Sequence, residues 1–87
     1  MVDSIETRTR AFIRETFPVA SGDIAADASL LGSGIIDSIG VLTLVTWLEQ
    51  EFGIVVADED VVPENLDTLA RIVAFVERKS AANPQEA

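Results

Sequence analysis

Ser38 is the residue whose surroundings most clearly suggest chemistry, since it follows Asp37 where an apolar helical pattern begins. A hydroxyl at a helix N-terminus can accept a hydrogen bond from a free N–H group of the first turn, a contribution of about 1 kcal/mol, and Asp37 could do the same. Those N–H groups and the helix dipole also stabilise negative charge, so the helix would tolerate a phosphodiester on this oxygen. Spacing alone leaves both interpretations open, a helix cap and a modified serine.

Other reactive side chains are scarce. The 87 residues include no Cys and no His, which excludes disulfides, thiolate nucleophiles, zinc fingers and imidazole bases. Carboxylate chemistry remains open, but Asp58, Glu59 and Asp60 lack the spacing of a calcium loop, so we expect no metal site. The composition therefore argues against most catalytic classes.

The charge balance is acidic, with 15 Asp and Glu residues against six Lys and Arg and a net charge of −9. Negative charge disfavours binding to nucleic acid and to anionic membranes, and it favours partners with basic surfaces. Alternatively, the charge serves only to keep the domain soluble. No apolar run approaches the ~20 residues of a spanning helix, and residues 1–6 do not resemble a signal peptide. We therefore expect a cytoplasmic protein, monomeric by default, with no nucleic-acid or membrane partner.

The clearest helix is predicted over residues 38–52, where apolar residues recur at helical spacing and Gly53 follows as a residue that tolerates φ > 0. Its apolar stripe comprises Val41, Leu44, Val45, Leu48 and Phe52. Periodicity does not decide whether Val41, Leu44, Leu48 and Ile72 open a pocket for a long acyl chain or stay closed around an amino acid.

Two further long helices are predicted over about residues 3–17, capped by Asp3 or Ser4, and about residues 68–79, capped by Asp67. The connection between the first two helices, residues 19–37, is unusually long, which favours a functional loop. Its apolar residues should dock it on the core: Leu30, Leu31, Ile35 and Ile36.

The remaining segments are short. Residues 54–56 are expected to form a buried extended connection, and residues 58–63 a short acidic helical turn. The predicted fold is all-α, a small bundle of three main helices plus one short helix, with a domain over residues 1–80 and a flexible tail over residues 81–87.

The segment Leu31–Gly40, with the sequence LGSGIIDSIG, resembles the phosphopantetheine attachment motif of acyl carrier and peptidyl carrier proteins. In that family an Asp-Ser pair precedes a bulky apolar residue, which is Ile39 here. The resemblance continues through residues 47–54 and 63–69 and covers roughly residues 12–76.

The resemblance implies a carrier, not an enzyme, active in lipid or secondary-metabolite biosynthesis. A phosphopantetheinyl transferase would move 4′-phosphopantetheine from coenzyme A to Ser38 using Mg²⁺, with Asp37 helping to orient the transferase and its metal. The imported thiol would carry acyl or aminoacyl groups as thioesters between an adenylating acyl or amino acid ligase and downstream acyl-transferring enzymes. The composition agrees, because a chain without Cys has no thiol of its own.

Partner contacts are expected on the outer face of the second helix and on an acidic flank. The candidate partner-binding residues are Ile39, Thr43, Thr46, Glu49, Asp58 and Glu59. The chain is more similar to stand-alone D-alanyl and aminoacyl carriers than to the carriers of fatty-acid synthesis. It has Ile39 and Gly40 after the serine, and it has Thr43 at a position where carriers of fatty-acid synthesis commonly have Glu. The cargo stays open.

Two alternatives from other classes remain. The first is a helical protein-interaction module in which Ser38 is only a helix cap. The second is a regulatory domain phosphorylated at Ser38. Attachment of a phosphopantetheine group would separate both from the carrier.

Overall fold

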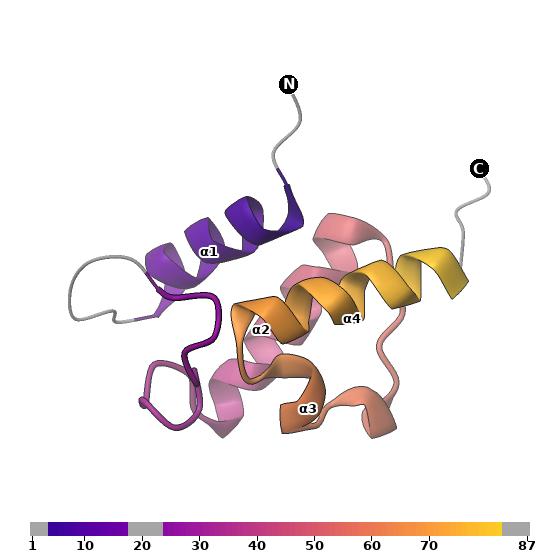
Figure 1. Ribbon diagram of the computed structural model, residues 1–87. Coiled ribbons are helices and arrows are strands. Elements are labelled where there is room, and N and C mark those ends of the chain that lie inside the picture. The colour runs from indigo at the N-terminus through magenta and orange to yellow at the C-terminus, as the bar shows by residue number, and fades with distance from the viewer. Residues whose placement is uncertain (1–3, 18–23, 83–87) are drawn as a thin grey trace.

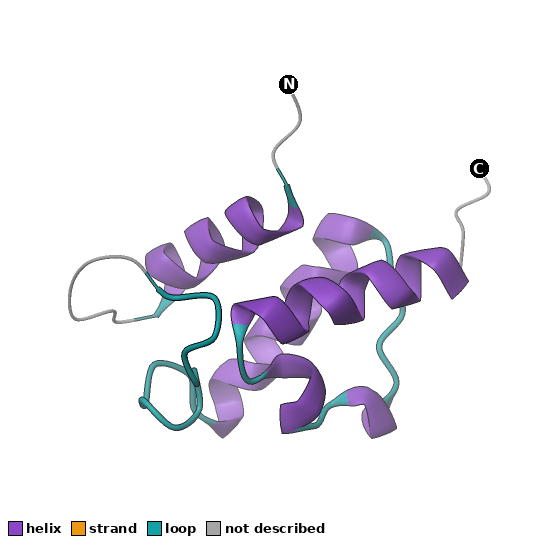
Figure 2. Ribbon diagram, in the orientation of Figure 1, coloured by secondary structure: helices purple, strands orange, loops and turns teal. Residues whose placement is uncertain are grey.

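The computed structural model describes residues 4–17 and 24–82, and within those ranges the regular elements are all helical (Figures 1 and 2). Three long helices, a short helix and a 3-10 turn follow one another as α1 (Ile5–Thr16), α2 (Ser38–Phe52), η1 (Asp58–Asp60), α3 (Pro63–Leu66) and α4 (Leu69–Ala82). Helix α4 is central to the packing, because it contacts α1, α2 and α3. The predicted all-α bundle is confirmed.

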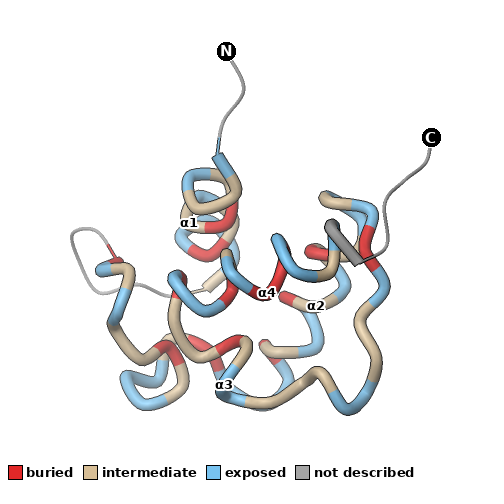
Figure 3. Tube along the Cα trace, turned by 45° about the vertical axis from the view of Figure 1, so that its right-hand side comes forward, coloured by how far each residue is buried: buried red, intermediate tan, exposed pale blue. Residues whose placement is uncertain are grey.

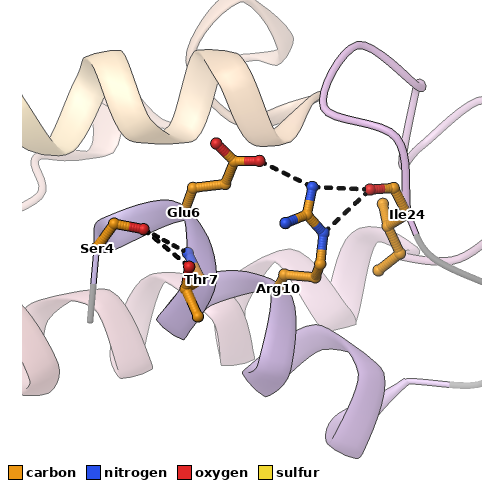
Figure 4. Close-up of polar contacts among 5 residues, drawn as sticks. All are labelled: Ser4, Glu6, Thr7, Arg10 and Ile24. Carbon is orange, nitrogen blue, oxygen red and sulfur yellow. Dashed lines mark hydrogen bonds and ion pairs between the residues drawn. The ribbon is translucent and has the colours of Figure 1, made fainter.

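The start of α1 is capped by Ser4, whose hydroxyl accepts a hydrogen bond from the Thr7 N–H at 3.0 Å (Figure 4). One helical turn further on, the Arg10 guanidinium donates to the Glu6 carboxylate at 2.8 Å and to the Ile24 carbonyl at 3.1 Å. Ile24 is the first described residue of the long loop, so Arg10 fastens that loop to α1. The other candidate cap, Asp3, lies outside the described residues.

Helix α2 has the predicted bounds. It ends at Phe52, and Gly53 follows in the left-handed conformation at φ 66°. The aromatic rings of Phe12 in α1 and Trp47 in α2 stack with centroids 4.4 Å apart, so Trp47 belongs to the margin of the core. The spacing of apolar residues and the glycine after them were sufficient to place this helix.

Buried residues of the core lie in every helix and in the loop before α2 (Figure 3). Its buried apolar members are Ile13, Ile24, Leu30, Ile36, Leu44, Leu48, Ile54, Leu66, Leu69, Ile72, Phe75 and Val76. The loop is therefore docked as expected, by buried Leu30 and Ile36 and by half-buried Leu31 and Ile35. Leu44, Leu48 and Ile72 have no exposed surface, so the interior that they line is closed.

The connection after α2 differs from the prediction in two respects. Ile54 is buried, but Val55 is 64% exposed, because side chains of an extended segment alternate between the core and solvent. The expected single turn over residues 58–63 is the 3-10 turn η1, and a separate helix, α3, begins at Pro63. Proline suits that first helical position, where its missing N–H leaves no hydrogen bond unmade.

The cap expected for α4 is also wrong. The hydroxyl of Thr68, not the carboxylate of Asp67, accepts a hydrogen bond from the N–H of Arg71, at 3.1 Å. Asp67 instead ends α3 and turns its carboxylate to the long loop. Helix α4 continues to Ala82, and residues 83–87 of the expected tail lie outside the described residues.

Candidate functional site

At the N-terminus of α2, the side chains of two neighbouring residues have different roles. Asp37 is the cap: its carboxylate accepts a hydrogen bond from the Gly40 N–H at 2.7 Å. Ser38 is the first helical residue and is exposed, and no hydrogen bond within the described ranges involves its hydroxyl. The structure therefore does not favour the interpretation of Ser38 as the helix cap, because Asp37 caps α2.

Gly40 has a packing role in the same turn. It is buried, and a Cβ at this position would lie 2.7 Å from Cε1 of Phe17 and 3.2 Å from Cγ2 of Ile36. A larger residue would push Phe17 away from the start of α2. The glycine two residues after Ser38 thus follows from close packing beneath the helix.

A groove of about 240 Å³ lies beside Ser38. Its lining is otherwise apolar and comes from three parts of the chain: Leu31 in the loop, Val41 in α2, and Val61, Val62, Pro63 and Leu66 around the start of α3. Sequence reasoning missed this groove because its walls are far apart in the chain. It is open to solvent beside the exposed serine, whereas the interior around Leu44 is closed.

Asp67 joins two walls of this groove. Its carboxylate accepts hydrogen bonds from the Leu31 N–H at 2.9 Å and from the Ser29 hydroxyl at 2.8 Å, and its carbonyl accepts from the Leu30 N–H at 2.6 Å. The Leu31 N–H, followed by the Ser29 hydroxyl, holds the pKa of Asp67 below its ordinary value against the opposing effect of burial. The carboxylate is therefore ionised at neutral pH.

The outer face of α2 next to Ser38 is uncharged. Ile39 is 74% exposed and Thr43 and Thr46 are exposed, as expected for residues outside the apolar stripe. Leu42, which sequence reasoning did not single out, is 61% exposed on the same helix. We call Ile39, Leu42, Thr43 and Thr46 the α2 outer face, which follows the spacing i, i+3, i+4, i+7.

The acidic candidates lie further along the chain and differ in their contacts. Glu49 is half-buried, and its carboxylate accepts a hydrogen bond from the Val56 N–H at 2.9 Å, so it stabilises the connection after α2. Asp58 and Glu59 are exposed in η1. Their neighbour Asp60 pairs with Lys79 at 2.9 Å, and this contact is the main cause of its lowered pKa.

Residues 4–17 and 24–82 contain no group of three or more acidic, His or Cys side chains placed to hold a metal ion. None of the helices described there has the length and apolar character needed to cross a membrane.

Comparison with known proteins identifies the family. The family model described as "Phosphopantetheine attachment site" matches residues 8–76, so the chain belongs to this family of carrier domains. It is 34% identical over 76 residues to Acyl carrier protein 2 of Pseudomonas aeruginosa, an alignment that covers 87% of this chain and 94% of that protein.

Two further relatives have the same level of identity. The acyl carrier protein of Akkermansia muciniphila is 34% identical over 76 residues, covering 87% of this chain and 92% of that protein. The D-alanyl carrier protein of Abiotrophia defectiva is 34% identical over 56 residues, covering 64% of this chain and 71% of that protein. The predicted family, the carrier function and 4′-phosphopantetheine as the cofactor are confirmed.

Proposed function

We propose that the hydroxyl oxygen of Ser38 is the atom to which 4′-phosphopantetheine is attached. The observation that carries this proposal is the division of roles between neighbours: Asp37 caps α2, while the exposed Ser38 hydroxyl makes no hydrogen bond within the described residues. Esterification of Ser38 would therefore cost the helix no cap. A phosphate on the first residue of a 15-residue helix would also lie near its free N–H groups.

Attachment is a phosphoryl transfer in which Ser38 is the nucleophile. The oxygen forms a bond to the phosphorus nearer pantetheine in the pyrophosphate of coenzyme A, and the bond from that phosphorus to the other phosphate breaks. Adenosine 3′,5′-bisphosphate leaves, and we propose that the hydroxyl proton passes to a base of the transferase. Oδ1 of Asp37 accepts the cap hydrogen bond, and we propose that Asp37 would also help to orient the transferase and its Mg²⁺.

The groove beside Ser38 suits the prosthetic group. Its apolar lining can cover the methyl-bearing part of the arm or a short acyl or aminoacyl group, whereas Leu44, Leu48 and Ile72 leave the interior closed. We therefore propose that the thiol carries a small acyl or aminoacyl cargo as a thioester. The bound group supplies the thiol, which this chain lacks.

We propose the α2 outer face as the docking surface for the phosphopantetheinyl transferase, an adenylating acyl or amino acid ligase and later acyl-transferring enzymes. It follows Ser38 directly, and residues 38–48 carry no charge although the whole chain has a net charge of −9. The exposed acids Asp58 and Glu59 would steer basic partners from η1. In this role the chain is a cytoplasmic carrier and catalyses no step itself.

Mass spectrometry tests the attachment. The protein is incubated with coenzyme A, Mg²⁺ and a broad-specificity transferase, and its intact mass is measured for the wild type, Ser38→Ala and Ser33→Ala. Ser33 is the matched control, an exposed serine of the preceding loop. We expect a gain of one phosphopantetheine group in the wild type and Ser33→Ala and none in Ser38→Ala. A gain in Ser38→Ala, or none in the wild type, would refute the proposal.

A further inference from the structure

The polar groups of Asp67 form hydrogen bonds with both walls of the groove beside Ser38. Its N–H donates to the carbonyl of Pro63 at 3.0 Å, within the wall formed by α3. Its carbonyl and carboxylate accept from the N–H groups of Leu30 and Leu31, which belong to the loop wall. One residue thus ties together two segments more than 30 positions apart in the chain.

Ser29 extends this connection into the loop. Its hydroxyl lies 2.8 and 2.9 Å from the two carboxylate oxygens of Asp67, to which it donates, and it accepts from the Gly32 N–H at 2.8 Å. A Cβ on Gly32 would lie 2.7 Å from the same hydroxyl oxygen, so the turn closes tightly over Ser29. We call Asp67 and Ser29, with the hydrogen bonds they make, the loop clamp.

We propose that Asp67 is a positioning residue for the modification of Ser38, because the loop clamp holds Leu31 at a fixed separation from α3 and so keeps the groove in the shape that the transferase recognises. This inference rests on the proposed attachment to Ser38. Asp67 itself is not part of the groove lining, and it acts through Leu31 on one side and through Leu66 and Pro63 on the other.

Removal of the loop clamp would reduce the preorganisation of the groove. Without the clamp the loop wall adopts several positions, and only some of them match the transferase. The apparent affinity of the transferase for the carrier then equals the intrinsic affinity multiplied by the fraction of carrier molecules in a matching position. Once the complex has formed, the partner holds both walls and the Ser38 hydroxyl reacts as before. Loss of the clamp should therefore raise the KM for the carrier and leave kcat unchanged.

Steady-state kinetics of the transferase with the unmodified carrier as substrate test this. Asp67→Ala should raise KM about three- to tenfold, with kcat within about twofold. Asp67→Asn keeps one carbonyl oxygen for the Leu31 N–H and should lie between Asp67→Ala and the wild type. Ile13→Val, a core change in α1 away from the groove, is the control for reduced stability and should leave KM unchanged.

A double-mutant cycle and hydrogen exchange add readouts that stability alone would not change. Ser29→Ala should raise KM less than Asp67→Ala, and the double variant should be no worse than Asp67→Ala, since both residues belong to one clamp. The amide of Leu31 should exchange faster in Asp67→Ala, while the amide of Ile13 keeps its protection.

The outcomes separate the two proposals. A wild type that gains no phosphopantetheine at Ser38 overturns the attachment and the clamp's role with it. A wild type that is modified, with the same KM in Asp67→Ala and Ser29→Ala as in Ile13→Val, overturns the positioning role alone. So does a fall in kcat at constant KM, or an equal rise in KM for Ile13→Val.

Discussion

The first turn of α2 allows a sharp comparison of two adjacent substitutions, Asp37→Ala and Ser38→Ala. Asp37→Ala removes the acceptor that lies 2.7 Å from the Gly40 nitrogen, together with a negative charge at the positive end of the helix. Loss of such a cap costs about 1 kcal/mol, with a range of about 0.5–2 kcal/mol. In a domain of this size, about 1 kcal/mol corresponds to a fall in Tm of about 4–8 °C.

Ser38→Ala removes no hydrogen bond that the structure describes, and alanine has the higher helix propensity. The free energy of unfolding should therefore stay within about 0.5 kcal/mol of the wild type. The two neighbours should also differ in attachment: Ser38→Ala abolishes it, whereas Asp37→Ala retains the nucleophile.

Urea unfolding followed by tryptophan fluorescence is a suitable assay, because Trp47 is the single Trp of the chain and stacks on Phe12. Asp37→Asn is the matched control, since its side-chain carbonyl can still accept from Gly40 and should preserve most of the stability. If Ser38→Ala were as destabilising as Asp37→Ala, the Ser38 hydroxyl would be a cap, and its availability for attachment would be refuted.

Three further predictions concern stability. Thr9→Val should stabilise the protein by about 1 kcal/mol in urea unfolding, because the buried Thr9 hydroxyl has no partner among the described residues; no gain would show that the hydroxyl is bonded in solution. Gly40→Ala should cost about 1–3 kcal/mol in the same assay through its contact with the Phe17 ring, and unchanged stability would show that the ring yields. The folded-state pKa of Asp67 is lowered, so its contribution is complete above the unfolded pKa near 3.9 and is lost as pH falls through the lower folded value. The difference in unfolding free energy between wild type and Asp67→Ala should thus be constant from about pH 7 to 5 and shrink below about pH 4; an undiminished difference at pH 2 would contradict this.

Elements specified by local patterns could be predicted from the sequence. Helix α2 has the expected bounds because its apolar stripe is regular and Gly53 adopts the left-handed conformation that ends it. The docking of the long loop was also predictable, since burial of several apolar side chains in one segment is favourable, and Leu30 and Ile36 are buried. In each case the information lies within a few residues of the element itself.

Features that depend on distant residues could not be predicted in this way. Asp67 precedes a helical pattern and so resembles a cap, but its carboxylate bonds to Ser29 and Leu31, 38 and 36 positions earlier. Thr68, one residue further on, supplies the cap instead. The groove beside Ser38 was missed for the same reason, because Leu31 meets α3 only after the chain has folded.

In the sequence Asp37-Ser38-Ile39-Gly40, the outer two residues stabilise the start of α2, whereas the inner two have exposed side chains. Asp37 and Gly40 form the cap hydrogen bond, and Gly40 leaves room for Phe17, so the outer pair fixes the start of α2. The side chains of Ser38 and Ile39 are exposed, and neither makes a hydrogen bond within the described residues. Because neither side chain of the inner pair holds this turn together, we expect the proposed prosthetic group on Ser38 and the proposed partner contact at Ile39 to leave the helix folded.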